Sequence, residues 1–268
     1  MSVALAIIYH DPHNRLTNLL MRVAPLLTRT FAGIAVQASP VASELSLTVF
    51  QTIGALIGRD TPDQLGNAPL LLGRARRNAL RLAQDLGTSH ILYFDADRLL
   101  HWADRYPDEL TDAVAHISDT DVTIFGRTPR AFATHPQTQR DTEAIINRVF
   151  AAITNHTWDV TGAGRGLSQR AATAIVDGCP DEQISVDVTW PLHLWQSGAF
   201  SITYRELEGL EFETPDRYTP EVVAAGGLTM WMQQIDADPR RWAHRLNIAR
   251  IQTEAMIAYG RADTHLAG

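Results

Sequence analysis

Short, wholly apolar runs alternate with amphipathic stretches over the first 125 residues, and this alternation constrains the fold more than any other feature. Continuous apolar runs of strand length indicate strands that are buried on both faces. We predict strands at 3–9, 32–38, 90–94 and 121–125, helices at 16–27, 43–57, 74–86 and 107–117, and a polar loop at 58–69. Such an alternation predicts an α/β fold with a mostly parallel, Rossmann-like sheet flanked by helices.

The second half of the chain is less regular. We expect a polar, proline-punctuated stretch at 127–142, helices at 143–153, 169–176 and 186–195, an edge strand at 200–205 and an amphipathic C-terminal helix at 239–259. The sequence shows no internal repeat and no long linker. We therefore predict one domain, 1–268, whose first half (1–126) binds a nucleotide and whose second half (127–268) binds another substrate.

Charge and composition exclude several classes of protein. The chain has 23 Lys and Arg against 30 Asp and Glu, a net charge of −7, which argues against a broad nucleic-acid binder. No apolar run approaches the roughly 18 residues of a membrane span, and the apolar start lacks the features of a signal peptide. We expect a cytoplasmic protein. The single cysteine, Cys179, excludes an internal disulfide and is expected to be a buried, inert thiol.

Two carboxylates, in the sequence Asp95-Ala96-Asp97, directly follow the predicted strand 90–94. Residues at i and i+2 of an extended chain face the same side. In open α/β sheets, ligands bind beyond the carboxyl ends of the strands, where this pair falls. Because two adjacent negative charges favour a hard divalent cation, we predict that Asp95 and Asp97 bind Mn²⁺ or Mg²⁺. The alternative is a solvated turn without a metal.

An arginine-rich helix precedes that strand, with Arg74, Arg76 and Arg77 followed by Asn78. Arg74 and Arg77 share a helix face, and Asn78 lies beside them. Guanidinium groups pair well with phosphate, so this face predicts a phosphate site next to the metal. The alternative is a solvated basic face.

Residues 73–80 and 91–97 together resemble the nucleotide-sugar half of the GT-A fold glycosyltransferases. In that family, an Arg/Lys-rich helix with an asparagine leads into the strand that carries an Asp-x-Asp metal motif. Residues 160–166 resemble the family's glycine-containing acceptor segment, and 185–192 resemble the segment whose acidic residue lies beside the acceptor. The order is similar to the mannosylglycerate-synthase and glucosyl-3-phosphoglycerate-synthase types over about residues 1–215.

The resemblance implies a metal-dependent transfer of a sugar from a nucleoside-diphosphate sugar to a small-molecule or glycan acceptor. It implies that Asp97 binds a cation bridging the two phosphates, while Asp95 faces the ribose or the second coordination shell of the cation. For the residues at the strand ends, the alternative is ordinary loop polarity. The residues expected to bind the nucleotide sugar are Tyr9, Asp11, Gln37, Arg74, Arg77, Asn78 and Asp95.

On the acceptor side, the resemblance implies that Gly162, Gly164 and Arg165 bind the acceptor. The glycines would let the backbone approach it closely, or they would only shape a turn. Asp187 is the expected catalytic residue, as a general base in an inverting enzyme or as a group that positions the acceptor hydroxyl in a retaining one. Its alternative is a carboxylate in the first turn of a helix, where the macrodipole favours negative charge.

Several positions depart from the family pattern. Residues 37–39 read Gln-Ala-Ser where many members have an aspartate that reads uracil, so guanine is as plausible as uracil. Arg98 follows the metal motif where an acidic or small residue is more usual. The candidates for a third metal ligand are Glu211, Glu213, His193 and His244.

Three other functions compete with this interpretation. A phosphohydrolase of the haloacid-dehalogenase type also places Asp-x-Asp after a buried strand, with the first aspartate as nucleophile. A nucleotidyltransferase of related fold normally has a glycine-rich loop after its first strand, whereas residues 10–14 contain no glycine. A non-catalytic nucleotide-sugar or carbohydrate-binding protein is the third alternative. For a homo-oligomer, the candidate contact is Trp231-Met232 in the segment 226–238, unless this pair packs internally.

Overall fold

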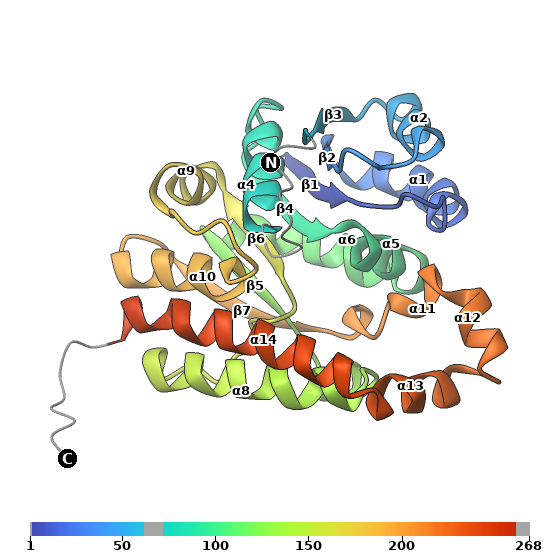
Figure 1. Cartoon of the computed structure of the whole chain (residues 1–268). Helices are drawn as coiled ribbons and strands as arrows, with labels where there is room; N and C mark the ends of the chain where they lie inside the picture. Colours follow the sequence, from blue (N-terminus) through green and yellow to red (C-terminus); the bar gives the residue numbers. More distant parts are fainter. Residues whose placement is uncertain (1, 62–71, 261–268) are drawn as a thin grey trace, which may run out of the picture.

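A seven-stranded sheet organises the residues that the computed structural model describes, 2–61 and 72–260 (Figure 1). Its strands are β1 (Val3–Tyr9), β2 (Gly33–Ala38), β3 (Leu56–Arg59), β4 (His90–Asp95), β5 (Val122–Arg127), β6 (Gly164–Ser168) and β7 (Ile202–Leu207). They lie in the order β3-β2-β1-β4-β6-β5-β7. Within these residues, β6 alone runs antiparallel to its neighbours, and the other pairs are parallel. The predicted mostly parallel sheet is confirmed, with β7 as an edge strand.

Strand β1 lies inside the sheet because both of its faces are apolar. Leu5 and Ile7 pack into the core on one face, and Ala4 and Ala6 pack into the core on the other. All four side chains are fully buried. The small alanines allow helix α4 (Leu72–Gln84) to pack closely across β1 and β2.

Helices cover both faces of the sheet. Beside α4, the layer over Ala4 and Ala6 contains α8 (Gln137–Thr154), α9 (Gln169–Gly178), α10 (Val186–Ser197) and α14 (Pro239–Met256), and Figure 1 shows α8 and α14 side by side. The opposite layer contains α1 (Thr17–Thr30), α2 (Glu44–Thr52), α5 (Ala96–Arg105) and α6 (Pro107–His116). Cys179, which follows α9, is buried as predicted.

Short helices complete the described part of the chain. They are α7 (Pro129–Ala133), α11 (Thr214–Arg217), α12 (Thr219–Ala224), α13 (Leu228–Ala237) and single 3₁₀ turns at Ile117–Asp119, Glu208–Leu210 and Ile257–Tyr259. Helices α11, α12 and α13 contain no buried residue and lie at the periphery (Figure 1). Trp231 of α13 is half-buried, with its ring stacked near those of Phe212 and Tyr218. A homo-oligomer stays a prediction.

Two of the corrections to the predicted pattern concern where helices end and begin. The helix predicted at 43–57 ends at Thr52, because Gly54 takes a positive φ of 78° and turns the chain into β3. The stretch 127–142, expected to be irregular, contains α7 and the start of α8. The prolines of this stretch stand where those helices begin, and the start of a helix is a position at which proline is favoured. Residues 62–69 of the predicted polar loop lie outside the described residues.

Among the helices that the structure describes, none combines the length and the apolar character needed to cross a membrane. The division into a nucleotide half and an acceptor half stays a prediction.

Candidate functional site

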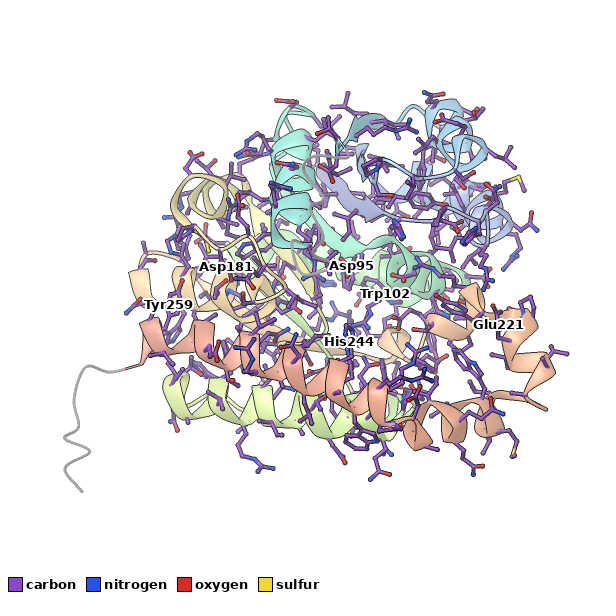
Figure 2. All side chains as sticks on the ribbon, viewed as in Figure 1. Asp95, Trp102, Asp181, Glu221, His244 and Tyr259 are labelled. Atoms are coloured by element: carbon purple, nitrogen blue, oxygen red, sulfur yellow. The ribbon has the colours of Figure 1, made fainter. Side chains whose placement is uncertain are left out.

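The two predicted metal ligands stand where β4 gives way to α5, near the middle of the molecule (Figure 2). Asp95 is the last residue of β4 and the N-cap of α5, and Asp97 lies in the first turn of that helix. A helix begins here in place of the expected turn, so the positive end of its dipole lies beside both carboxylates. Strands β1 and β4 are parallel, with Ile8 opposite Asp95, so the carboxyl end of β1 lies at the same edge.

Asp95 is held as an anion by two neighbours. Arg76 donates from Nη2 to Oδ2 over 2.7 Å and from Nε to Oδ1 over 3.2 Å. The Tyr93 hydroxyl donates to Oδ1 over 2.6 Å. Burial by itself would raise the pKa of Asp95, but the charge and hydrogen bonds of Arg76 bring it below its ordinary value.

Asp97 is less completely neutralised. Its Oδ2 lies 3.2 Å from Nη2 of Arg217, and its Oδ1 accepts the backbone N–H of Arg98 over 3.0 Å. Burial raises the pKa of Asp97, and the nearby charges of Glu213 and Asp95 raise it further, against the opposing effect of Arg217. This excess of negative charge is the electrostatic setting that a divalent cation would relieve.

The structure brings only one of the four candidate third ligands close to this pair. Glu213 is near Asp97 and pairs with Arg98 at 3.3 Å. Glu211 is bound instead by Arg130 at 2.8 Å. His193 lies against Gly178 at the end of α9, and His244 is exposed on α14.

The described residues contain no group of three His, Cys, Asp or Glu side chains that could hold a metal ion. This does not count against Mg²⁺ or Mn²⁺, because Mg²⁺ is commonly held by one or two carboxylates together with substrate phosphates. The Asp95–Asp97 pair therefore fits such an ion.

Arg76 is a candidate site residue that was placed in the arginine-rich helix but was not among the predicted binding residues. It is 3% exposed, and besides Asp95 it contacts the carboxylate of Asp187. The two carboxylates raise the pKa of Arg76 well above its ordinary value despite its burial, so the guanidinium stays charged. The sequence does contain a signal that could have identified Arg76. This arginine occupies the buried stripe of α4, whose other members are small or apolar: Gly73, Ala79, Leu80 and Ala83.

The Arg77 side chain contacts the loop before α10 rather than this pair of carboxylates, and Arg74 contacts the same loop through its backbone. Arg77 donates to the backbone carbonyl of Asp181 and lies 3.6 Å from the Glu182 carboxylate. The backbone N–H of Arg74 donates to the carbonyl of Glu182 over 3.1 Å. These contacts dock the start of α4 on the loop before α10. The contact of Arg74 and Arg77 with phosphate stays a prediction.

A second cluster lies at the carboxyl ends of β2 and β3. Asp60, 6% exposed, accepts hydrogen bonds from Gln37 over 2.8 Å and from Asn78 over 3.3 Å. Asp60 was not predicted as a site residue, because strand β3 was not predicted. A carboxylate therefore lies beside Gln37, and it follows the third strand rather than the second.

Tyr9 and Asp11 are also joined at this edge. The Tyr9 hydroxyl donates to Asp11 over 3.2 Å, and Asp11 also accepts the backbone N–H groups of Arg15 and Leu16 over 3.0 and 2.8 Å. Both residues are 1% exposed. In the structure Asp11 closes the loop that leads from β1 into α1, and its contact with a nucleotide stays a prediction.

Asp187 lies in the first turn of α10, which is the place that the alternative to a catalytic role predicts for it. Its carboxylate also faces Arg76. Gln252 of α14 donates to its Oδ2 over 3.1 Å. Burial raises the pKa of the Asp187 carboxyl, and Arg76 only partly counters this. A buried carboxylate with a raised pKa is suited to accept a proton.

The predicted acceptor residues are packed inside the protein. A Cβ on Gly164 would lie 2.0 Å from Cζ of Phe94, and a Cβ on Gly162 would lie 2.9 Å from the carbonyl of Phe125. Strand β6 therefore needs Gly164, and the loop before it needs Gly162, for internal packing. Arg165 is 2% exposed, and its contacts are backbone carbonyls, including that of Asp187 at 2.7 Å. Burial lowers the pKa of Arg165 to about 10. Acceptor binding by this group stays a prediction.

No protein-family model matches the sequence, and neither does any curated protein sequence. Among solved structures, the chain is similar to glucosyl-3-phosphoglycerate synthase from Mycobacterium tuberculosis in complex with Mn²⁺, UDP and phosphoglyceric acid. The TM-score is 0.52 at 12% identity, over 86% of this chain and 78% of that one. The chain has a GT-A fold.

Two further structures resemble this GT-A chain at lower scores. A complex of the same synthase with Mn²⁺, UDP and glucosyl-3-phosphoglycerate gives a TM-score of 0.49 at 11% identity, over 77% of this chain and 70% of that one. A candidate nucleotide-diphospho-sugar transferase from Desulfovibrio desulfuricans G20 gives 0.44 at 11% identity, over 97% and 99%.

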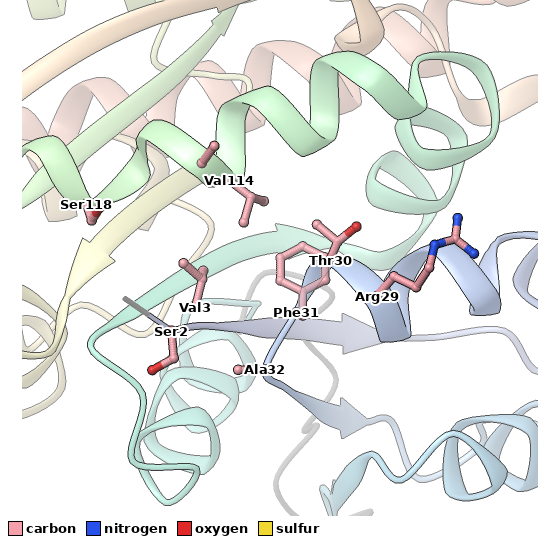
Figure 3. A pocket seen from close by; sticks show the side chains of 9 residues that line it. Ser2, Val3, Arg29, Thr30, Phe31, Ala32, Val114 and Ser118 are labelled. Atoms are coloured by element: carbon pink, nitrogen blue, oxygen red, sulfur yellow. The ribbon is translucent and has the colours of Figure 1, made fainter.

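The GT-A chain also has a surface pocket of about 490 Å³ far from the carboxylates (Figure 3). It lies at the amino end of β1, beside Val3, Arg29 and Phe31. Because α/β sheets bind ligands at the carboxyl ends of their strands, we do not assign a substrate to it.

Proposed function

We propose that this protein is a glycosyltransferase that uses Mn²⁺ or Mg²⁺ and moves a sugar from a nucleoside-diphosphate sugar to an acceptor hydroxyl. One observation carries the proposal. At the carboxyl edge of a GT-A sheet, Arg76 joins Asp95, at the end of β4, to Asp187, in the first turn of α10. We assign Asp95 to the donor side and Asp187 to the acceptor side. The solved relative of the same fold contains Mn²⁺ and UDP, which supports this class of donor.

The donor would bind along the edge formed by β1 to β4. Asp97 and Asp95 would hold the cation, which supplies positive charge to the departing diphosphate. Tyr9, Asp11 and Gln37 would lie toward the nucleoside, and Asp60 joins them because it holds Gln37. Arg74, Arg77 and Asn78 would lie toward the phosphates.

On the acceptor side, we propose that Asp187 accepts the proton of the attacking hydroxyl or positions that hydroxyl. Arg76 would hold Asp187 in place and neutralise both the buried carboxylate of Asp187 and the half-buried carboxylate of Asp95. Gly162, Gly164 and Arg165 would shape this side from within, since they hold β6 and the loop before it. The acceptor is a small molecule or a glycan.

We do not favour the haloacid-dehalogenase alternative. Its nucleophile would be Asp95, but the solved structure that shares this fold at a TM-score of 0.52 is a glucosyl-3-phosphoglycerate synthase with bound UDP, which supports the transferase instead. The experiments described next also distinguish a non-catalytic binding protein from an enzyme.

The test begins with calorimetric titration of the protein with UDP and GDP, each with and without Mn²⁺. We expect Mn²⁺ to strengthen the binding of one nucleotide, and Asp97→Asn to remove that gain while the thermal unfolding stays cooperative. The matched control is Asp104→Asn, which changes the same charge on the same helix at a carboxylate paired with Arg22. It should leave the gain intact.

A thermal-shift screen of UDP-, GDP- and ADP-sugars then identifies the donor, since a ligand at 100 times its Kd adds about 2.7 kcal/mol to the free energy of unfolding. Metal-independent binding, or equal gains in wild type and Asp97→Asn, would contradict the metal assignment. Tight binding of a donor without transfer to any acceptor or to water would favour the non-catalytic alternative.

A further inference from the structure

We propose that Arg217 is an internal counter-ion that a divalent cation must displace from Asp97, so that this arginine couples metal binding to donor binding. The inference rests on the proposed function, because it needs a cation site at Asp97. It adds a residue, Arg217, for which neither the sequence pattern nor the fold provides a role.

The position of Arg217 supports this role. It ends α11, and its Nη2 lies 3.2 Å from Oδ2 of Asp97, with both side chains about a quarter exposed or less (21% and 26%). Its Nε is buried and, within the described part of the chain, has no hydrogen-bond partner. The charge of Arg217 also acts on Tyr9 and His10 at the carboxyl end of β1. The guanidinium therefore lies beside the edge where the diphosphate of a donor is expected.

The segment that carries Arg217 is attached to α5 mainly by charge. We call residues 211–217 the strap. On α5, Arg98 pairs with Glu213 at 3.3 Å, and His101 pairs with Asp216 at 2.6 Å. Helix α11 contains no buried residue. The apolar anchor of the strap, the buried Phe212, lies before α11. Because ion pairs rather than apolar packing hold the helix itself, a change of charge at Asp97 can move α11 at little cost in buried surface.

A cation and Arg217 cannot both neutralise one carboxylate without repelling each other. A cation that binds alone must therefore break the ion pair between Arg217 and Asp97. When a diphosphate is also present, the released guanidinium has an anion within reach, to which it can donate several hydrogen bonds. Cation and nucleotide should then each strengthen the binding of the other by the same factor.

The test measures Mn²⁺ binding by electron paramagnetic resonance of the free ion, with and without UDP or GDP. We expect Arg217→Gln to bind Mn²⁺ alone at least about fivefold more tightly than wild type, the lower end of usual coupling factors. The strengthening of Mn²⁺ binding by the nucleotide should shrink in this variant. Arg22→Gln is the matched control and should behave like wild type. It removes the same charge from a pair with Asp104, which lies on the same helix as Asp97.

The outcomes separate this proposal from the proposed function. If Asp97→Asn abolishes Mn²⁺ binding but Arg217→Gln binds it like wild type, the role of Arg217 is wrong and the metal site stands. If Asp97→Asn leaves Mn²⁺ binding unchanged, the metal site itself is wrong, and with it the proposed function.

A measurement on the unmodified protein covers the case in which Arg217→Gln does not fold. The backbone amides of Asp216 and Tyr218 donate to carbonyls within the strap. Saturating Mn²⁺ alone should speed hydrogen exchange at these amides, and added nucleotide should slow it again. Exchange that does not respond to Mn²⁺ bound at Asp97 would overturn the proposal.

Discussion

Replacing Arg76 with glutamine tests the central feature of the site, a single guanidinium shared by two carboxylates. The change removes the charge that faces Asp95 and Asp187 and keeps a polar side chain on α4. The side chains of Arg76 and Asp187 are 4% and 8% exposed, so water cannot replace the lost partner. Asp95, with 29% of its side chain exposed, is partly solvated.

These exposures set the expected magnitude. Removing one partner of a buried ion pair costs about 3–5 kcal/mol. Because Asp95 can recover some hydration, we expect the lower end of this range for Arg76→Gln, a loss of about 3 kcal/mol in the free energy of unfolding. For a chain of this size, each kcal/mol lowers Tm by about 2–4 °C, so Tm should fall by about 6–12 °C.

The pH dependence of the stability loss shows whether the two unpaired carboxyls cause it. Without Arg76, the pKa values of both carboxyls should rise, because burial is then opposed only by the remaining neighbours, Tyr93 and Arg98 at Asp95 and Arg165 at Asp187. An acid with a raised pKa in the folded protein destabilises it at neutral pH, and protonation removes the penalty as the pH falls. The gap between wild type and Arg76→Gln should therefore be widest near neutral pH and should narrow toward about pH 4.

Thermal and urea unfolding followed by circular dichroism measure this gap at several pH values. The matched control is Arg81→Gln, on the same helix, where an exposed arginine donates to Asn78. This control should stay within about 0.5 kcal/mol of wild type. Adding Asp187→Asn to Arg76→Gln should recover part of the loss. If Arg76→Gln unfolds like Arg81→Gln, or if its deficit does not change with pH, the shared ion pair does not have the role inferred here.

Three further predictions concern single residues. Asp187→Asn should lower turnover by roughly 10²–10⁴-fold and leave donor affinity nearly normal. Steady-state kinetics and calorimetry check this, and near-normal turnover would leave Asp187 with only its place at the start of α10. Gly164→Ala should cost about 1–3 kcal/mol in unfolding measurements, because its Cβ would meet the Phe94 ring, and Phe94→Leu should recover part of the loss. Burial lowers the pKa of His101, but Asp216 raises it above its ordinary value, so this pair stabilises the fold at low pH and loses its effect as the pH rises through that pKa. Wild type should therefore lose more stability than His101→Gln between about pH 6 and pH 8, and parallel curves for the two proteins would refute this.

Features of the fold that depend only on residues close together in the chain could be predicted from the sequence. The wholly apolar run at 3–9 can only be a buried segment, and it is β1 with its predicted bounds. The place of Asp95 and Asp97 at a strand end followed directly from the apolar residues before them. Strand β3 could not be predicted in the same way, because its four residues are half exposed and are extended mainly through pairing with β2.

The sequence by itself determined the mostly parallel sheet, the helices that cover it and the position of the two carboxylates at its carboxyl edge, because hydrophobic period and strand ends are local properties. Only the tertiary structure decided which charged groups meet there. Arg76 rather than Arg77 enters the site because Arg76 lies on the face of α4 that packs on the sheet. Arg217 reaches Asp97 because α11 docks on α5. The partner of a charged side chain depends on which surfaces pack together, and the residues that form those surfaces are far apart in the chain.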